Sequence, residues 1–361
     1  MQRPNPHRKI REKAVFLSVA LIIAVVPLHS QNSPRELMVM GIHPGGIVVL
    51  DAARDEVVTE IPLRGRAPKE IEFSRDGKRL YVTTQGRRSI EVVDLASRRV
   101  QEVIDLAPSG YKLVIYGIAL SQDGDTLYAQ VKPVELLPDE FKVESPQIWA
   151  YDLTSHKSRK VAEVPEGVAA IIALGDGKRL IGWGRDLYFI DIASGRTLDT
   201  VPLFSSSTGH PPLDSLPLFT QYERSGIFSI PYYTSNPASS AVAMGLVNID
   251  VQTGNVDFVD LGPAVPLFSA VVSPDRKHAF AVMNHLIAVD LEQRRVTKVV
   301  DLDRTKYVVN ISQDGKKLYV SGAGPFMDVY DTQSLKLIKK LELSGDGSVT
   351  ALRFLPANAM P

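Results

Sequence analysis

The stretch that decides the fold is Ile71-Glu-Phe-Ser-Arg-Asp-Gly-Lys-Arg-Leu-Tyr-Val-Thr-Thr84, followed by Ser89-Ile-Glu-Val-Val-Asp94. Two β-patterned runs flank Asp76-Gly77. This dipeptide is a strong hairpin signal, because a type I′ turn needs positive φ at both central positions. The stretch therefore predicts a type I′ hairpin and then a third strand that ends in Asp.

The same unit recurs along the chain. Asp-Gly follows an apolar run again at Asp123-Gly124, Asp176-Gly177 and Asp314-Gly315, and two copies are degenerate, Glu223–Gly226 and Ser273–Lys277. Strands that end in Asp occur seven times, at Asp51, Asp94, Asp152, Asp191, Asp250, Asp290 and Asp331. The Asp carboxylate can accept a backbone N–H two residues later, which suits the start of a turn. A spacing of roughly 40 to 60 residues is typical of four-stranded blades. We predict an all-β, seven-bladed β-propeller.

The two ends of the repeat region are complementary. Residues 36–63 contain three expected strands without an inner strand before them, and Ser348–Phe354 is a lone strand with nothing after it. Pairing them removes two unpaired edges. We expect the C-terminal strand to join the first blade and to close a single domain, residues 36–355.

The N-terminus has the pattern of a secretory signal. Residues 1–13 are basic, the apolar run Ala14–Leu28 follows, and a polar stretch ends near Gln31. The run is shorter than the ~18–20 residues that span a bilayer. We expect residues 1–31 to be a signal peptide, with an uncleaved anchor as the alternative, and the protein to be exported, to the periplasm or the cell exterior, in either case.

Composition excludes several kinds of chemistry. The chain has no cysteine, so it has no disulfide, thiolate zinc site, iron–sulfur ligand or Cys-linked haem. Formal net charge is zero, and no basic run follows the first 13 residues, which argues against a nucleic-acid partner.

The search for a catalytic constellation gives none. The expected inner strands, Ile71–Ser74, Ile118–Ser121, Val168–Leu174, Leu218–Tyr222, Ser269–Ser273, Val308–Ser312 and Val349–Phe354, are mostly small and β-branched. Their polar exceptions, Glu72, Gln221, Asn310 and Arg353, form no recognisable metal or acid–base set. The pair His278 and His285 fits ordinary surface roles better than metal ligation. We predict no catalytic, cofactor-binding or metal-binding residue.

Two blades are longer than the others. One contains the insertion Lys132–Gln147, and the other contains Phe204–Pro212 and Tyr232–Ser240. Long loops on a regular scaffold are usually functional or disordered. The residues that we select as candidate partner contacts are Phe141, Phe204, Tyr222, Tyr232 and Tyr233.

Several pieces, in this order, resemble a known family. Tyr81-Val-Thr-Thr84 matches the YVTN-type propellers. The more specific pieces are Tyr116–Ala129 with Val131-Lys-Pro133, Phe141–Gln147, Val282–Leu286, Val300–Tyr307, Gly315–Gly322 and Asp328–Thr332. Together they resemble the β subunit of quinohaemoprotein amine dehydrogenase and, more distantly, the heavy chain of methylamine dehydrogenase. The stretch Phe204–Ser240 departs from the family, which has large aromatic and basic residues there.

This resemblance implies a heterotrimer that oxidatively deaminates primary amines. In the family a small subunit carries cysteine tryptophylquinone, another carries two c-type haems, and the propeller holds no cofactor but scaffolds the others and helps to wall the amine pocket. The expected role is thus a non-catalytic subunit of an enzyme complex. The alternative is a stand-alone YVTN-type envelope propeller that binds a protein or polymer. A propeller hydrolase or lactonase would need a polar channel that the inner strands do not predict.

Overall fold

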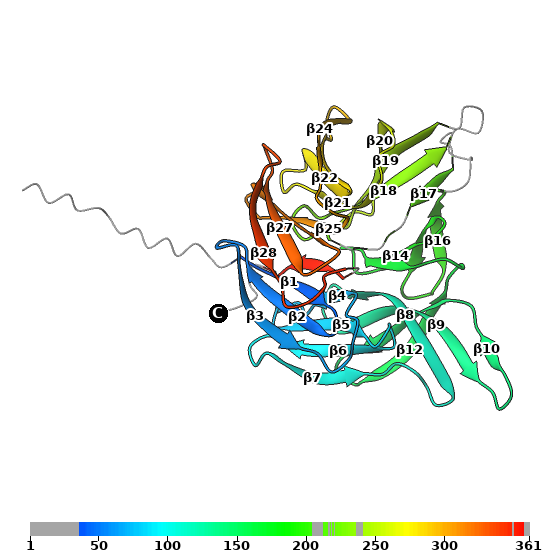
Figure 1. Cartoon of the computed structure of the whole chain (residues 1–361). Helices are drawn as coiled ribbons and strands as arrows, with labels where there is room; N and C mark the ends of the chain where they lie inside the picture. Colours follow the sequence, from blue (N-terminus) through cyan, green and yellow to red (C-terminus); the bar gives the residue numbers. More distant parts are fainter. Residues whose placement is uncertain are drawn as a thin grey trace, which may run out of the picture. The chain divides into compact units, whose positions relative to one another are not determined.

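The structure is a computed structural model. It describes residues 36–203, 212–215, 217, 219, 221–235, 241–348 and 350–356. Within these residues every regular element is a β-strand, and no helix is long and apolar enough to cross a membrane. The strands form seven antiparallel sheets, the blades of a β-propeller, in the unit Arg35–Pro361 (Figure 1).

Each blade is given from its innermost strand outward. Blade 1 consists of β29 (Leu352–Phe354), β1 (Leu37–Ile42), β2 (Gly46–Asp51) and β3 (Glu56–Pro62). Blade 2 consists of β4 (Ile71–Phe73), β5 (Arg79–Thr84), β6 (Ser89–Asp94) and β7 (Arg99–Ile104). Blade 3 consists of β8 (Tyr111–Leu120), β9 (Thr126–Leu136), β11 (Gln147–Asp152) and β12 (Lys157–Glu163), with β10 (Phe141–Val143) added along β9.

The other four blades follow the same order. Blade 4 consists of β13 (Ala170–Ala173), β14 (Arg179–Trp183), β15 (Leu187–Asp191) and β16 (Thr197–Val201). Blade 5 consists of β17 (Leu213–Ser215), β18 (Ile227–Ser235), β19 (Val242–Asp250) and β20 (Val256–Pro263). Blade 6 consists of β21 (Leu267–Val272), β22 (His278–Met283), β23 (His285–Asp290) and β24 (Arg295–Asp301). Blade 7 consists of β25 (Lys306–Ile311), β26 (Lys317–Gly322), β27 (Phe326–Asp331) and β28 (Leu337–Glu342).

The predicted closure of the ring is confirmed. The last strand, β29, pairs antiparallel with β1, and Arg353 is the partner of Val39 in this register. In Figure 1 the red strand near the C-terminus lies against blue β1. This pairing covers the inner edge of β1, which would otherwise have unpaired backbone groups.

Seven apolar cores hold the blades together. Each core is shared by two blades that are neighbours in the ring. For example, Tyr319 of blade 7 and Met38 of blade 1 belong to one cluster, and Leu80 of blade 2 and Val49 of blade 1 belong to another. The remaining clusters join blades 2 and 3, 3 and 4, 4 and 5, 5 and 6, and 6 and 7. The ring is therefore packed continuously from blade to blade.

The Asp residues that end the third strands cap the turns as expected. Asp51 accepts the backbone N–H of Ala53 at 2.9 Å, and Asp250 accepts that of Gln252 at 2.9 Å, in each case two residues later. The type of the first turn, however, is not the one expected. Positive φ is found at Gly77 (66°) but not at Asp76. The hydroxyl of Ser74 donates to Asp76 at 2.6 Å and accepts the N–H of Arg79 at 2.9 Å, so a wider loop closed by Ser and Asp replaces the type I′ turn.

The inner strand of blade 5 is the other correction. The sequence predicted it at Leu218–Tyr222, whereas the structure places it at β17, Leu213–Ser215. The residues described within the predicted range, Phe219, Gln221 and Tyr222, are in no strand. Pro217 precedes them and cannot donate a ladder hydrogen bond. The described residues between β17 and β18 take another course, and this course shapes the centre of the ring.

Candidate functional site

One end of the ring carries the long connections. Because each blade is antiparallel, the start of the first strand, the end of the second and the start of the third lie at the same end. In blade 5, Leu213 pairs with Thr234, and Ser235 pairs with Val242. In blade 3, the β9–β10 connection leaves from the corresponding end of its second strand. We call this end the long-loop face.

A hairpin projects from the long-loop face at blade 3. Strands β8 and β9 are longer than their counterparts in most other blades, and β10 adds to β9 with Phe141 opposite Leu136. Figure 1 shows β10 at the far end of this extension. Phe141 is 73% exposed and Val143 is 60% exposed. Large apolar side chains on a projecting hairpin are typical of a protein contact.

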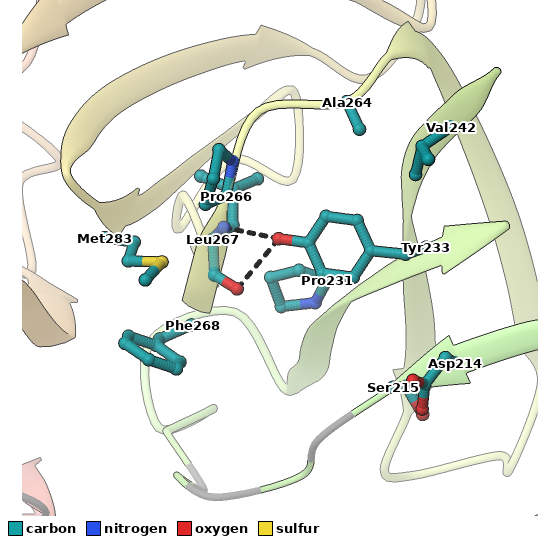
Figure 2. A pocket seen from close by; sticks show the side chains of 10 residues that line it. All are labelled: Asp214, Ser215, Pro231, Tyr233, Val242, Ala264, Pro266, Leu267, Phe268 and Met283. Atoms are coloured by element: carbon teal, nitrogen blue, oxygen red, sulfur yellow. Dashed lines mark hydrogen bonds between the residues drawn. The ribbon is translucent and has the colours of Figure 1, made fainter. Parts of the chain in front are cut away.

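An apolar cavity of about 450 Å³ lies on the same face, between blades 5 and 6. Figure 2 shows its lining: Asp214, Ser215, Pro231, Tyr233, Val242, Ala264, Pro266, Leu267, Phe268 and Met283. Phe268 stacks on Tyr307 with ring centroids 5.1 Å apart. Apart from the backbone and Tyr233, polar groups come only from Asp214 and Ser215. Such a lining suits an apolar side chain better than a charged one.

Tyr233 fixes one wall of this cavity. Its hydroxyl donates to the carbonyl oxygen of Leu267 at 2.9 Å and accepts the N–H of the same residue, which ties blade 5 to blade 6 (Figure 2). Burial raises the pKa of Tyr233, so the hydroxyl stays protonated as a donor at neutral pH. The cavity is thus preformed rather than a product of loose packing.

The five candidate contact residues do not lie together. Phe141 and Tyr233 are both on the long-loop face, on the hairpin and in the cavity wall. Tyr232 does not reach the surface: it is 1% exposed, its ring lies over Gly245 where a side chain would collide, and its hydroxyl bonds Asp260. Strict alternation along β18 explains why its neighbour faces the opposite side. Tyr222 lies in the central channel, and Phe204 is outside the described residues.

The central channel is crossed by the chain itself. Between β17 and β18, Phe219 packs in the core shared by blades 7 and 1, and the Lys69 ammonium lies 5.2 Å from its ring centroid. Two residues later, the Gln221 amide donates to the carbonyl of Ala270 in blade 6 at 3.2 Å. We call Phe219 and Gln221–Arg224 the channel segment.

The channel segment ends in contacts with blades 7 and 1. The Arg224 guanidinium donates to Glu36, next to β1, at 2.6 Å and to the side chain of Gln313 in blade 7 at 2.7 Å. It also lies over the ring of Phe354, 4.0 Å from the centroid. Residues that leave blade 5 therefore bind across the ring, and they occupy the space that a ligand would use in an open channel.

A buried ionic cluster forms where the channel segment meets the inner strands. The Arg353 guanidinium donates to Glu72 at 3.2 Å, to the carbonyl of Ile71 at 2.8 Å, and to Glu223. The Asn310 amide lies 3.5 Å from the Glu223 carboxylate and donates to the carbonyl of Leu352 at 2.9 Å. Three of the four polar exceptions of the inner strands are thus brought together.

Electrostatics give the two carboxylates different roles. Burial raises the pKa of Glu72, and Arg353 offsets this only in part. Burial alone would lower the pKa of Arg353, but Glu223 and Glu72 outweigh it and raise this pKa well above its usual value. Burial therefore makes the charged form of Glu72 less favourable, although it lies beside the Arg353 guanidinium. The cluster therefore joins blade 1, blade 2 and the channel segment, and each of its described charged groups is bound to another member of the cluster.

The sequence missed Glu223. It lies in a degenerate copy of the Asp-Gly turn, and an acidic residue there was interpreted as part of a turn.

The described histidines do not form a cluster. His285, for example, pairs with Asp301 at 2.8 Å at the surface. Across the described ranges, no group of three or more His, Asp or Glu side chains is placed to hold a metal ion.

Comparisons with known proteins support the fold. No family model matches the chain, and no curated protein matches it. Among solved structures it is similar to the dihydro-heme d1 dehydrogenase NirN in complex with DHE, with a TM-score of 0.56 and 16% identity over 88% of this chain and 75% of that one. It is also similar to Kuenenia stuttgartiensis hydrazine synthase, with a TM-score of 0.55 and 17% identity over 83% of this chain and 90% of that one. At these identities the likeness shows a propeller fold alone.

Proposed function

We propose that this chain is the non-catalytic propeller subunit of a periplasmic, quinohaemoprotein-type amine dehydrogenase. Its long-loop face would hold a small subunit with cysteine tryptophylquinone and a dihaem cytochrome c subunit. The observation that carries the proposal is the pairing, on one face, of an exposed apolar hairpin at Phe141 and Val143 with a preformed apolar cavity beside Tyr233. Protein partners bury such features when they bind.

Two further observations support a scaffold role. The channel segment and the Arg353 cluster occupy the centre of the ring, so ligand chemistry there would require the chain to move aside. The chain also has no cysteine, so neither a Cys-derived quinone nor a Cys-linked haem can be attached to it. In this proposal the redox chemistry belongs to the partner subunits, and this chain positions them.

Co-expression with candidate quinone and dihaem subunits tests the proposal. We expect a complex that oxidises primary amines with an artificial electron acceptor, whereas the isolated chain shows no turnover. Phe141→Asp combined with Val143→Asp should abolish the complex. The matched control is Leu337→Asp with Ile338→Asp, because these side chains are each 50% exposed on the outer strand of blade 7. It should leave the complex intact.

Two outcomes would contradict the proposal. One is amine turnover by the isolated chain. The other is a stable monomer that ignores both subunits, which would favour the stand-alone envelope propeller. Loss of the complex in both double variants would point to general destabilisation of the ring instead of a contact at the hairpin.

A further inference from the structure

Blade 5 differs from the other blades at one repeated cross-strand pair. In every blade, the residue two positions before the Asp of the third strand pairs with a residue of the second strand. In six blades both partners are apolar: Val39–Val49, Tyr81–Val92, Tyr128–Ala150, Ile181–Phe189, Phe280–Ala288 and Tyr319–Val329. In blade 5 the pair is Ser229–Asn248.

The apolar pairs belong to the cores between neighbouring blades. The pair in blade 5 is buried as well, with Ser229 1% and Asn248 9% exposed. Yet the Ser229 hydroxyl and the Asn248 side-chain oxygen have no hydrogen-bond partner among the described residues. A buried polar group without a partner costs about 1–3 kcal/mol, so native proteins almost always supply one.

A cavity of about 650 Å³ adjoins this pair, between blades 5 and 6. Asn248 lines it, and Ser229 lies directly across the strand from Asn248 on the same face of the sheet. Tyr or Phe occupies the corresponding second-strand position in four other blades, and Ser229 is the smaller residue at this position in blade 5. One of the two unpartnered groups, on Asn248, therefore lines the cavity, and the other, on Ser229, lies beside it across the strand, at a position that an aromatic ring fills in four blades.

The charged side chains around the cavity balance one another, so the cavity does not favour an ionic ligand. The Asp250 carboxylate is paired with Arg276 at 2.8 Å, and Asp257 is paired with Arg294 at 2.9 Å. Lys277 and Glu292 add one charge of each sign. A ligand therefore needs neutral groups that both donate and accept hydrogen bonds, for the Ser hydroxyl and the Asn amide.

The apolar part of the lining narrows the class of ligand. Ile227, Val272 and Leu291 face the same space as Asn248 and can pack against C–H groups. A sugar ring combines C–H faces with hydroxyl groups in this way. We propose that the Ser229–Asn248 pair forms the floor of a binding site for a neutral, polyhydroxylated ligand of the size of one or two sugar units.

The test copies the blade 6 pair into blade 5. The unmodified chain and the variant Ser229→Phe/Asn248→Ala are each titrated with D-glucose and with N-acetyl-D-glucosamine, and saturation-transfer NMR measures the binding. We expect the unmodified chain to bind at least one sugar, the double variant to bind it at least tenfold more weakly, and the melting temperature of the variant to rise as the cavity fills. Ser229→Ala, which removes only the hydroxyl, should weaken binding and should raise the melting temperature less than the double variant does.

Ser269→Ala is the matched control. Its hydroxyl is also fully buried without a partner among the described residues, but Ser269 pairs with Val282, which is not a lining residue, whereas Ser229 pairs with Asn248, which is one, so sugar binding should be unchanged. The proposal is overturned if neither sugar binds the unmodified chain, which would mean that the cavity holds water alone. It is also overturned if the double variant and the unmodified chain bind equally.

Discussion

Arg353, in the last strand of the chain, donates a hydrogen bond to the carboxylate of Glu223, which lies 130 residues earlier in the sequence. The same guanidinium bonds Glu72 of blade 2. One buried side chain therefore connects blade 1, blade 2 and the channel segment of blade 5. The stability of the ring should depend on this connection in ways that can be measured.

Glu223→Gln should destabilise the protein by about 2 kcal/mol, the scale of hydrogen bonds to a charged group. Glu223 accepts from Arg353 and from the backbone N–H of Tyr222 at 3.1 Å, and it lies within 3.5 Å of Asn310. Glu72→Gln is the matched control and should cost less than 1 kcal/mol, because burial raises the pKa of Glu72 and makes its charged form less favourable. Urea unfolding at pH 7.5 measures both; equal losses would show that the two carboxylates share one role.

The raised pKa of Glu72 predicts a pH dependence. A carboxyl group whose pKa is higher in the folded state stabilises the fold at low pH, and this contribution is lost as pH rises through the folded-state pKa. Turn aspartates such as Asp76 and Asp94, whose pKa values are lowered by hydrogen bonds from serines and the backbone, act in the opposite direction. The stability of the unmodified chain relative to Glu72→Gln should therefore fall between acidic and neutral pH. Melting curves of both proteins across this range isolate the effect, and a constant difference would refute it.

Deletion of the chain from Ser348 onward should destabilise the whole ring, beyond the loss of one blade. It removes β29 and with it the inner cover of β1, the Arg353 cluster, and Phe354, which packs edge-on against Tyr319 at 5.8 Å. We expect a large fall in melting temperature with a single, broader transition. A truncated protein with an unchanged melting temperature would contradict the role of the closing strand.

Tyr319→Phe should cost about 1–2 kcal/mol, since it leaves buried acceptors without their donor. The hydroxyl lies 2.7 Å from the carbonyl oxygen of Ala52 and 2.8 Å from a carboxylate oxygen of Asp55, both in blade 1. Tyr128→Phe, at the equivalent position in blade 3, should cost less. Chemical denaturation of the two variants compares them, and a larger loss for Tyr128→Phe would refute the proposed tie between blades 7 and 1.

The sequence was sufficient to predict the features that recur within each blade. Period-two strands and strand-final Asp residues are visible over short windows, so the number of blades followed from them, and the two incomplete ends predicted the closure. The course of the channel segment could not be predicted in this way. Phe219 and Glu223 find their partners in blades that are distant in sequence, and Pro217 removes the strand pattern locally. The first turn was assigned the wrong type because the Ser74 side chain, rather than the Asp-Gly pair alone, closes it.

The pair Ser229–Asn248 could be predicted from the sequence only in part. The position of Asn248 in its strand follows from Asp250, which ends that strand two residues later. Only the pairing of β18 with β19 shows that Ser229 lies opposite it, and only burial shows that both polar groups lack partners. The pair stands out only when the equivalent cross-strand pairs of all seven blades are compared, and this comparison requires the strand register of every blade.

The joining of the last strand to the first blade also sets an order of assembly. A ribosome releases β1 early, but its inner partner β29 is made only after the other strands of all seven blades. Until then the exposed edge of β1 can pair with other chains, so the growing polypeptide has to be kept from aggregating. A chaperone that binds extended segments should therefore have its longest contact with the first blade.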